Sequence, residues 1–254
     1  FGLVAYCTIA IQYLDILNTG GIDSALISRR EKVEEAANSA FIANITLGIV
    51  SYVIAWLAAP SIALFFKSDE IILLIRTLAI VLPIAGLGLV PSAMIMRSLR
   101  FREKLIVGVS QSVSKGLISV VLALMGYGVW SLIWGQIIGE IVSTIVLWSL
   151  ANWWPSWKFD RSSTIEVMTF GAHIILVEVA GQIRNNVDYL IVGRLLGASV
   201  LGAYTLAYRI PELAIRSFDR VIGGVSFPLL AQVQADKDFL KSTYLGYIRY
   251  ISMF

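Results

Sequence analysis

Long apolar runs, separated by short charged or glycine-rich breaks, limit what this chain can fold into. Ala37–Phe66, for example, contains no charged residue. A helix needs about 20 apolar residues to cross a hydrocarbon core about 30 Å thick. The composition agrees, since 57% of the residues are hydrophobic and 15% are charged, whereas soluble domains have about 25% charged residues. The sequence therefore predicts an all-α, polytopic integral membrane protein.

The apolar runs predict a series of membrane spans along the whole chain. These are Gly2–Leu17, Ala37–Phe66, Ile71–Met96, Leu105–Met125, Val129–Leu150, Met168–Val192, Val200–Leu230 and the start of another at Tyr244–Phe254. Both ends of the chain lie inside apolar runs. We therefore expect it to be an internal piece of a longer protein.

Basic residues gather in alternate connections between these spans. One set of connections holds eleven Lys and Arg residues, whereas the other set holds only Lys67 and Arg194. Short loops that carry such an excess of positive charge stay on the cytoplasmic side. The bias therefore predicts that the basic connections are cytoplasmic. The segment "NWWPSW", Asn152–Trp157, follows a span at a cytoplasmic boundary, where we expect its aromatic rings to act as interfacial anchors.

Several function classes are disfavoured by what the chain lacks. Cys7 is the only cysteine and His173 the only histidine, which leaves no intrachain disulfide, no cysteine-based metal site and little scope for Ser-His-Asp chemistry. Gly86-Leu87-Gly88 lies inside an apolar run and follows no strand, so it is no dinucleotide fingerprint. The basic residues form short clusters rather than a nucleic-acid surface. We expect no cofactor, no metal, no nucleic acid and no enzymatic activity.

A stripe of charge runs down the expected span Val200–Leu230. Its members are Arg209, Glu212, Arg216, Asp219 and Arg220. Steps of three and four put them on one helical face, where acids and bases partly neutralise each other but leave a positive excess. A charge in lipid is costly and usually faces water or a partner. The stripe therefore indicates a cavity-facing surface, with the alternative that Asp219 and Arg220 emerge into the cytoplasm. Pro211 should bend this helix.

The preceding span carries two polar faces. One face is formed by Glu178, Gln182, Asn185 and Tyr189, and the opposite one by Arg184 and Asp188. We expect one face to contact a neighbouring helix and the other to line the cavity, with the assignment left open. His173 fits an ordinary packed histidine and a proton carrier equally well.

Lys115 and Glu140 lie on two spans joined by the tight turn Gly126–Gly128. In an antiparallel helical hairpin both charges would lie roughly 18–20 Å from the turn. Each has polar companions on its own face, among them Gln111 and Gln136. Three interpretations stay open: a buried ion pair, a site where Lys115 binds an anionic substrate while Glu140 offsets its charge, and a purely structural pair.

Several segments, in order along the chain, resemble one family. They are "FGLVAYCTIAIQYLDILNTGGIDSALISRR", "LGLVPSAMIMRSLRF", "MGYGVWSLIWGQIIGEIVSTIVLW" and "NNVDYLIVGRLLGASVLGAYTLAYRI". The last segment, with Asp188, Gly193-Arg194, Gly197, Gly202, Tyr204 and Tyr208-Arg209, carries the most specific part of the likeness. On these residues the chain resembles the polysaccharide transporter family, the oligosaccharide-lipid flippases of the multidrug, oligosaccharidyl-lipid and polysaccharide exporter superfamily.

The resemblance implies a fold of two six-helix lobes around a central cavity, in some members with two further helices. This chain would cover about helices two to eight and the start of helix nine. Residues 1–151 would form most of the N-terminal lobe without its first helix. Residues 152–163 would form the cytoplasmic inter-lobe connection, and residues 164–254 the start of the C-terminal lobe.

The resemblance also implies a function in the bacterial cytoplasmic membrane, the flipping of a polyprenyl-diphosphate-linked oligosaccharide for a surface polysaccharide. Arg and Lys side chains in the cavity would suit the diphosphate, an H⁺ or Na⁺ gradient could drive transport, and polysaccharide polymerase machinery is an expected partner. The alternatives are a multidrug cation antiporter, a peptidoglycan-precursor flippase and, from another class, a membrane-embedded polymerase or glycosyltransferase. An antiporter for cations should prefer an acidic cavity, whereas the Val200–Leu230 stripe is basic.

Overall fold

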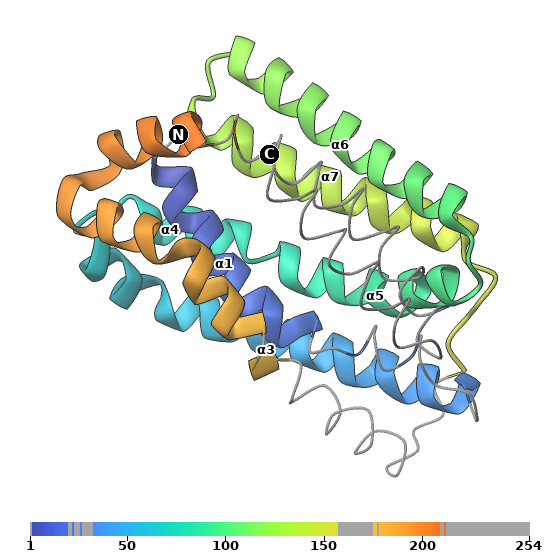
Figure 1. Cartoon of the computed structure of the whole chain (residues 1–254). Helices are drawn as coiled ribbons and strands as arrows, with labels where there is room; N and C mark the ends of the chain where they lie inside the picture. Colours follow the sequence, from blue (N-terminus) through green and yellow to red (C-terminus); the bar gives the residue numbers. More distant parts are fainter. Residues whose placement is uncertain are drawn as a thin grey trace, which may run out of the picture. The chain divides into compact units, whose positions relative to one another are not determined.

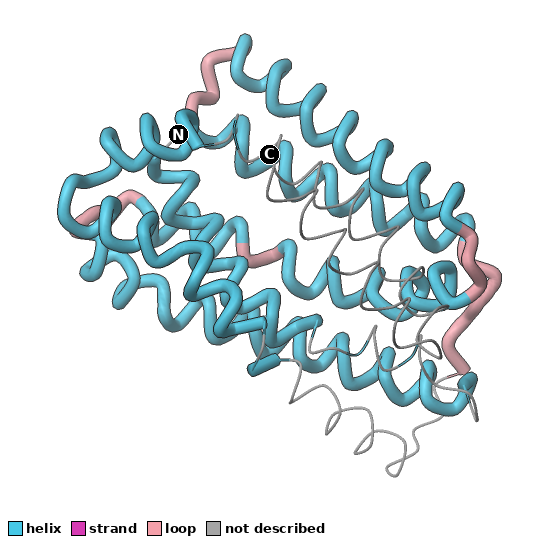
Figure 2. Tube along the Cα trace, viewed as in Figure 1, coloured by secondary structure: helices cyan, strands magenta, loops and turns pink. Residues whose placement is uncertain are grey.

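The computed structural model describes residues 2–19, 22, 26, 33–156, 175–176, 178–208 and 211. Among these residues the chain is helical apart from short connections, and none forms a strand (Figure 2). The chain divides into two compact units, Phe1–Ala203 and Tyr204–Phe254. This architecture confirms the all-α prediction.

The helices of the described part are seen in Figure 1. They are α1 (Gly2–Thr19), α3 (Val33–Phe66), α4 (Ile71–Leu78), α5 (Val81–Arg97), α6 (Phe101–Leu124) and α7 (Val129–Leu150), followed by the helical segment Glu178–Tyr208. Five helical stretches among the described residues are long and apolar enough to cross a membrane, with α4 and α5 forming one of them. The multi-pass prediction is therefore confirmed, and α7 has the predicted bounds.

The predicted span Ile71–Met96 is divided into α4 and α5 by a turn at Ala79 and Ile80. Proline has no backbone N–H, so Pro83 cannot donate to the carbonyl of Ala79 four residues earlier. The backbone N–H of Leu82 donates to that carbonyl instead, at 2.9 Å. The break is therefore a local consequence of one proline.

Pro60 in α3 leaves a second carbonyl without its helical donor, that of Trp56. A lipid environment cannot supply the missing hydrogen bond. Arg76 of α4 supplies it, since its Nε donates to the Trp56 carbonyl oxygen at 3.3 Å. The guanidinium carbon also lies 3.9 Å from the centre of the Trp56 ring. This proline therefore helps to fix how α4 packs on α3.

Pro91 in α5 frees the carbonyl of Leu87 in the same way. The indole Nε1 of Trp148 in α7 donates to that oxygen at 3.1 Å. Trp148 continues into an aromatic cluster with Phe41 and Trp153, each Phe41 ring pair having centroids 5.7 Å apart. Trp153 of the predicted interfacial segment is buried against α3, and the role of this segment as an interfacial anchor stays a prediction.

Two asparagines join α1, α3 and α5 in the interior. Asn18 and Asn44 are almost completely buried, and their amide nitrogens donate to the carbonyl oxygens of Leu82 at 3.0 Å and Gly86 at 2.8 Å. A Cβ added at Gly48 would lie 3.1 Å from the Leu82 carbonyl oxygen. Small residues that admit close backbones, together with polar side chains that bond across helices, are the usual means of packing helices in lipid.

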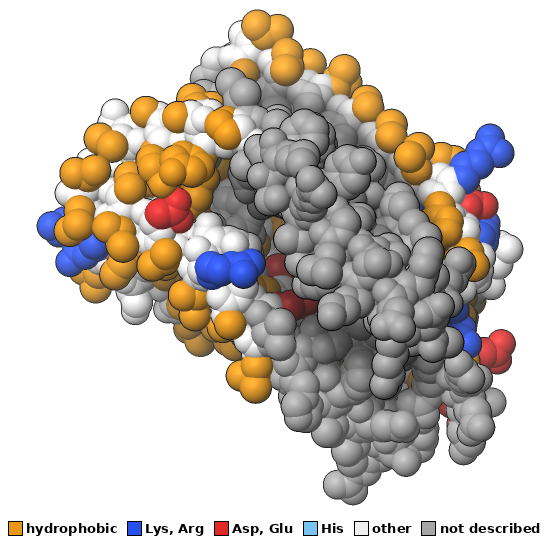
Figure 3. Space-filling model, in the orientation of Figure 1, with side chains coloured by type: hydrophobic (Ala, Val, Ile, Leu, Met, Phe, Trp, Pro, Cys, Tyr) orange, Lys and Arg blue, Asp and Glu red, His pale blue; other side chains and the backbone are white. Residues whose placement is uncertain are grey.

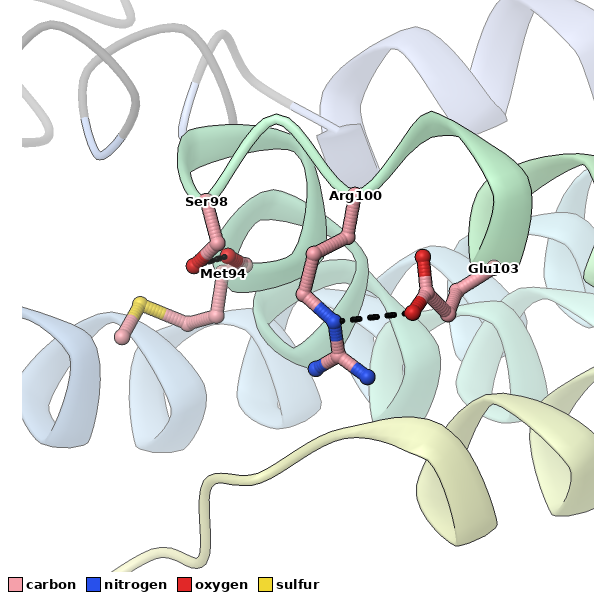
Figure 4. A network of polar contacts seen from close by, with 4 residues as sticks. All are labelled: Met94, Ser98, Arg100 and Glu103. Carbon is pink, nitrogen blue, oxygen red and sulfur yellow. Dashed lines mark hydrogen bonds and ion pairs between the residues drawn. The ribbon is translucent and has the colours of Figure 1, made fainter.

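The connection from α5 to α6 is held by local polar contacts (Figure 4). The hydroxyl of Ser98 donates to the carbonyl of Met94 at 2.9 Å, which closes the last turn of α5. Nε of Arg100 donates to Oε1 of Glu103 at 3.1 Å, which ties the connection to the first turn of α6. This basic connection is expected to face the cytoplasm.

Candidate functional site

The hairpin of α6 and α7 carries four polar side chains that meet at mid-length. Gln111 donates from Nε2 to Oε2 of Glu140 at 2.6 Å, and Lys115 donates from Nζ to Oε1 of Gln136 at 3.1 Å. We call these four residues the amide–charge ladder. Each charged side chain bonds an amide of the opposite helix, so the hairpin register predicted from the Gly126–Gly128 turn brings the expected residues together.

Glycines on α7 allow the two helices of the ladder to approach closely. A Cβ built on Gly139 would lie 2.9 Å from Cβ of Lys115, and one built on Gly135 would lie 2.9 Å from the Lys115 carbonyl oxygen. The two glycines are four residues apart, as in the small-xxx-small contacts of membrane helices. The close backbone contact holds the ladder side chains within hydrogen-bonding reach of each other.

The ladder lies on a different side of α6 from its apolar stripe. That stripe is formed by the exposed side chains Leu105, Val109, Val113, Leu117, Val120 and Leu124, and Figure 3 shows apolar side chains in a row along this helix. Gln111, Gln136 and Glu140 are half-buried and Lys115 is exposed. Lipid chains offer no hydrogen-bond partners, so the bonds between these side chains partly replace the ones that water would supply.

Among the described residues, no group of three or more His, Cys, Asp or Glu side chains could hold a metal ion. The three interpretations of Lys115 and Glu140 stay predictions.

One face of the segment Glu178–Tyr208 packs on α1. Nε2 of Gln182 donates to Oε1 of Gln12 at 3.0 Å, and the hydroxyl of Tyr13 donates to the Gln182 carbonyl at 3.4 Å. Further along, the hydroxyl of the fully buried Tyr6 donates to the carbonyl of Gly193 at 2.9 Å. The face that contains Gln182 is therefore the one that contacts a neighbouring helix.

The opposite face of this segment carries Arg184 and Asp188. Arg184 is exposed and Asp188 is half-buried, and Nε of Arg184 donates to Oδ1 of Asn185 at 3.4 Å. Glu178, which the sequence places on the Gln182 face, is exposed at the start of the segment. The structure thus answers which face packs, while the binding roles of Arg184, Asp188 and Glu178 stay predictions.

The predicted connection between the last two spans contains a sharp turn. Gly197 has a φ of 82°, a conformation that glycine adopts without strain. Just before the turn, the guanidinium of Arg194 lies 5.4 Å from the ring of Phe65. In the second unit, the rings of Tyr204 and Tyr208 have centroids 4.5 Å apart.

The charged stripe of the expected span Val200–Leu230 cannot be placed in this way. Its members, Arg209, Glu212, Arg216, Asp219 and Arg220, lie outside the described residues, as does His173. Their common face is still a prediction from their spacing.

Fold and site together define a class, that of all-helical multi-pass membrane proteins with polar side chains paired between two spanning helices. Within it, this chain belongs to the family described as polysaccharide biosynthesis proteins, whose sequence profile matches residues 1–254. The family expected from the sequence resemblance is thereby confirmed. No solved structure matches the chain.

Three relatives from bacteria illustrate the family. The chain is 25% identical to the teichuronic acid biosynthesis protein TuaB of Bacillus subtilis, over 92% of this chain and 49% of that protein. It is 25% identical to the succinoglycan biosynthesis transport protein ExoT of Rhizobium meliloti, over 94% of this chain and 48% of that protein. It is 26% identical to the lipopolysaccharide biosynthesis protein WzxC of Escherichia coli, over 96% of this chain and 50% of that protein. The chain thus spans about half the length of these relatives.

Proposed function

We propose that the protein containing this chain is a flippase for a polyprenyl-diphosphate-linked oligosaccharide used in a bacterial surface polysaccharide. The observation that carries this proposal is the polar ladder of α6 and α7 inside a multi-pass bundle whose relatives are named for polysaccharide biosynthesis or transport. A saccharide head group cannot cross lipid unaided, because its hydroxyls would lose their hydrogen bonds to water. A polar path between apolar helices removes that obstacle.

Transport would proceed by alternating access between two lobes, in which one lobe rocks against the other around a fixed site. Residues 1–151 would form most of one lobe, and residues 164–254 would begin the other. The hydrogen bonds of α1 with the Gln182 face would then join the two lobes in the conformation observed. The inter-lobe connection at residues 152–163 would allow the movement.

The diphosphate would bind the basic stripe. Arg209, Arg216 and Arg220 carry one positive charge more than Glu212 and Asp219 offset. Arginine suits this task because its planar guanidinium can donate two parallel hydrogen bonds to phosphate oxygens. A positive site is needed, since the diphosphate loses its hydration on leaving the headgroup region. Arg184 and Asp188, on the face that does not pack against α1, would line the same cavity.

The protein would act as a transporter without enzymatic activity. A gradient of H⁺ or Na⁺, or the substrate gradient itself, would supply the energy, and polysaccharide polymerase machinery would use the flipped product. The basic connections would face the cytoplasm, so that export runs from the inner leaflet of the cytoplasmic membrane to its outer leaflet.

The test is complementation of a bacterial host that lacks its flippase, using the full-length protein. We expect surface polysaccharide to be restored and the lipid-linked oligosaccharide to stop accumulating. Arg209→Ala and Arg216→Ala should each lower export at normal expression, whereas Lys241→Ala, in an expected cytoplasmic connection, should not. Full export by both cavity variants would contradict the diphosphate site. Efflux of organic cations without any restored polysaccharide would favour the antiporter instead.

A further inference from the structure

We propose that the amide–charge ladder of Gln111, Lys115, Gln136 and Glu140 binds the sugar hydroxyls of the transported lipid, and not its diphosphate. This inference rests on the proposed function and assigns different parts of one substrate to different helices. The diphosphate would be held by the basic stripe, and the saccharide by the hairpin of α6 and α7.

The net charge of the ladder argues against a diphosphate ligand. Lys115 contributes one positive charge and Glu140 one negative charge, so the four side chains of the ladder carry no net charge. Like charges repel strongly where the local dielectric constant is low. A diphosphate beside this ladder would find no excess of positive charge and would lie close to the Glu140 carboxylate, whereas a neutral polyhydroxyl ligand needs no positive excess.

The hydrogen-bond donors and acceptors of the ladder suit the hydroxyl groups of a sugar. A glutamine side chain can take part in up to four hydrogen bonds, two through its oxygen and two through its nitrogen. Within the described part of the chain, Gln111 and Gln136 each make one, to Glu140 and Lys115. The oxygen of Gln111 and the amide N–H groups of Gln136 thus offer acceptors and donors side by side. Hydroxyl groups need both, because each one donates and accepts.

The side chains of the ladder are also held rigidly enough to distinguish one sugar from another. The bonds of 2.6 Å and 3.1 Å fix the planes of the two amides, and Gly135 and Gly139 bring the α7 backbone against Lys115. Groups that are ordered before the ligand arrives lose less entropy when they bind it. The two hydrogen bonds and the close glycine contacts therefore favour specific binding of a saccharide over non-specific contact.

The position of the ladder places this recognition inside the membrane. Lys115 and Glu140 lie on spanning helices, roughly 18–20 Å along the helices from their connecting turn, which is deep within a hydrocarbon core about 30 Å thick. A head group that crosses the bilayer must pass this depth. The ladder would therefore bind the saccharide midway through its transfer.

The test compares two probes on the full-length protein in lipid nanodiscs: the host's lipid-linked oligosaccharide, and polyprenyl diphosphate without sugar. Gln111→Leu and Gln136→Leu remove the hydrogen-bonding groups at similar volume. Thr46→Val is the matched control, since it also replaces a polar side chain by an apolar one of similar size, at an exposed position on α3 whose hydroxyl donates to the Ile42 carbonyl of the same helix. We expect each ladder variant to weaken binding of the oligosaccharide lipid by about fivefold or more, as for a lost hydrogen bond. Binding of the sugar-free lipid should stay within about twofold of the original protein.

The outcomes separate the two proposals. Unchanged binding of the sugar-free lipid also shows that a ladder variant is folded. If a ladder variant weakens the binding of both probes equally, or keeps the full preference for the oligosaccharide lipid, the ladder does not bind the sugar. If the unaltered protein binds and flips neither probe, the flippase function itself fails, and the ladder assignment fails with it.

Discussion

Substitution of Gly139 by alanine tests whether the two helices of the ladder meet as closely as the structure shows. The added Cβ would lie 2.9 Å from Cβ of Lys115, 3.1 Å from the Gln111 carbonyl oxygen and 3.4 Å from Cα of Lys115. Carbon atoms in comfortable contact are about 3.5–4.0 Å apart, and neither backbone nor Cβ atoms can rotate away. The helices must therefore separate by roughly 0.5–1 Å, which costs about 1–3 kcal/mol by overpacking.

Alanine also favours the helix over glycine by up to about 1 kcal/mol, so the net destabilisation should be roughly 1–2 kcal/mol. Gly116 on α6 is the matched control, because a Cβ added there meets nothing within 4 Å. Gly116→Ala should be neutral or stabilising by up to about 1 kcal/mol. The assay is reversible unfolding in mixed detergent micelles, followed by far-UV circular dichroism. If Gly139→Ala is as stable as Gly116→Ala, the close contact of α6 and α7 is refuted.

Two further substitutions test individual hydrogen bonds in the same unfolding assay. Trp148→Phe removes the donor to the Leu87 carbonyl and should destabilise the protein by about 1–3 kcal/mol. In a Pro91→Ala background the backbone N–H of residue 91 can donate to this carbonyl instead, so the same substitution should cost less stability. An equal loss of stability in both backgrounds would contradict the role of Trp148 as a replacement donor. Tyr6→Phe keeps the ring but removes the donor to the Gly193 carbonyl, so it should cost about 1 kcal/mol; no measurable change would indicate that this bond does not join α1 to the segment Glu178–Tyr208.

Much of the candidate site follows from spacing along the sequence. The turn at Gly126–Gly128 predicts that Lys115 and Glu140 meet across a hairpin, and the structure brings both into one polar region. The spacing could not show that each charged side chain bonds an amide of the opposite helix. That detail depends on side-chain direction and on how closely Gly135 and Gly139 let the helices approach.

The contacts of Arg76 and Trp148 have a signal in the sequence, which is the proline inside each of two spanning helices. A proline inside a spanning helix leaves the carbonyl four residues earlier without a donor. Pro60 and Pro91 therefore identify the oxygens of Trp56 and Leu87 as groups that need partners in lipid. Only the packing of neighbouring helices decides which side chains fill those places, and here they are Arg76 and Trp148.

The sequence by itself determined that this chain is a set of apolar helices with a few polar positions, because hydrophobic length and charge spacing are local properties. It also identified the family through the glycine and charge pattern that surrounds Gly193-Arg194. Only the tertiary structure decided which face of Glu178–Tyr208 packs on α1, since both faces are polar. That choice depends on contacts between residues far apart in the chain, which no local pattern encodes.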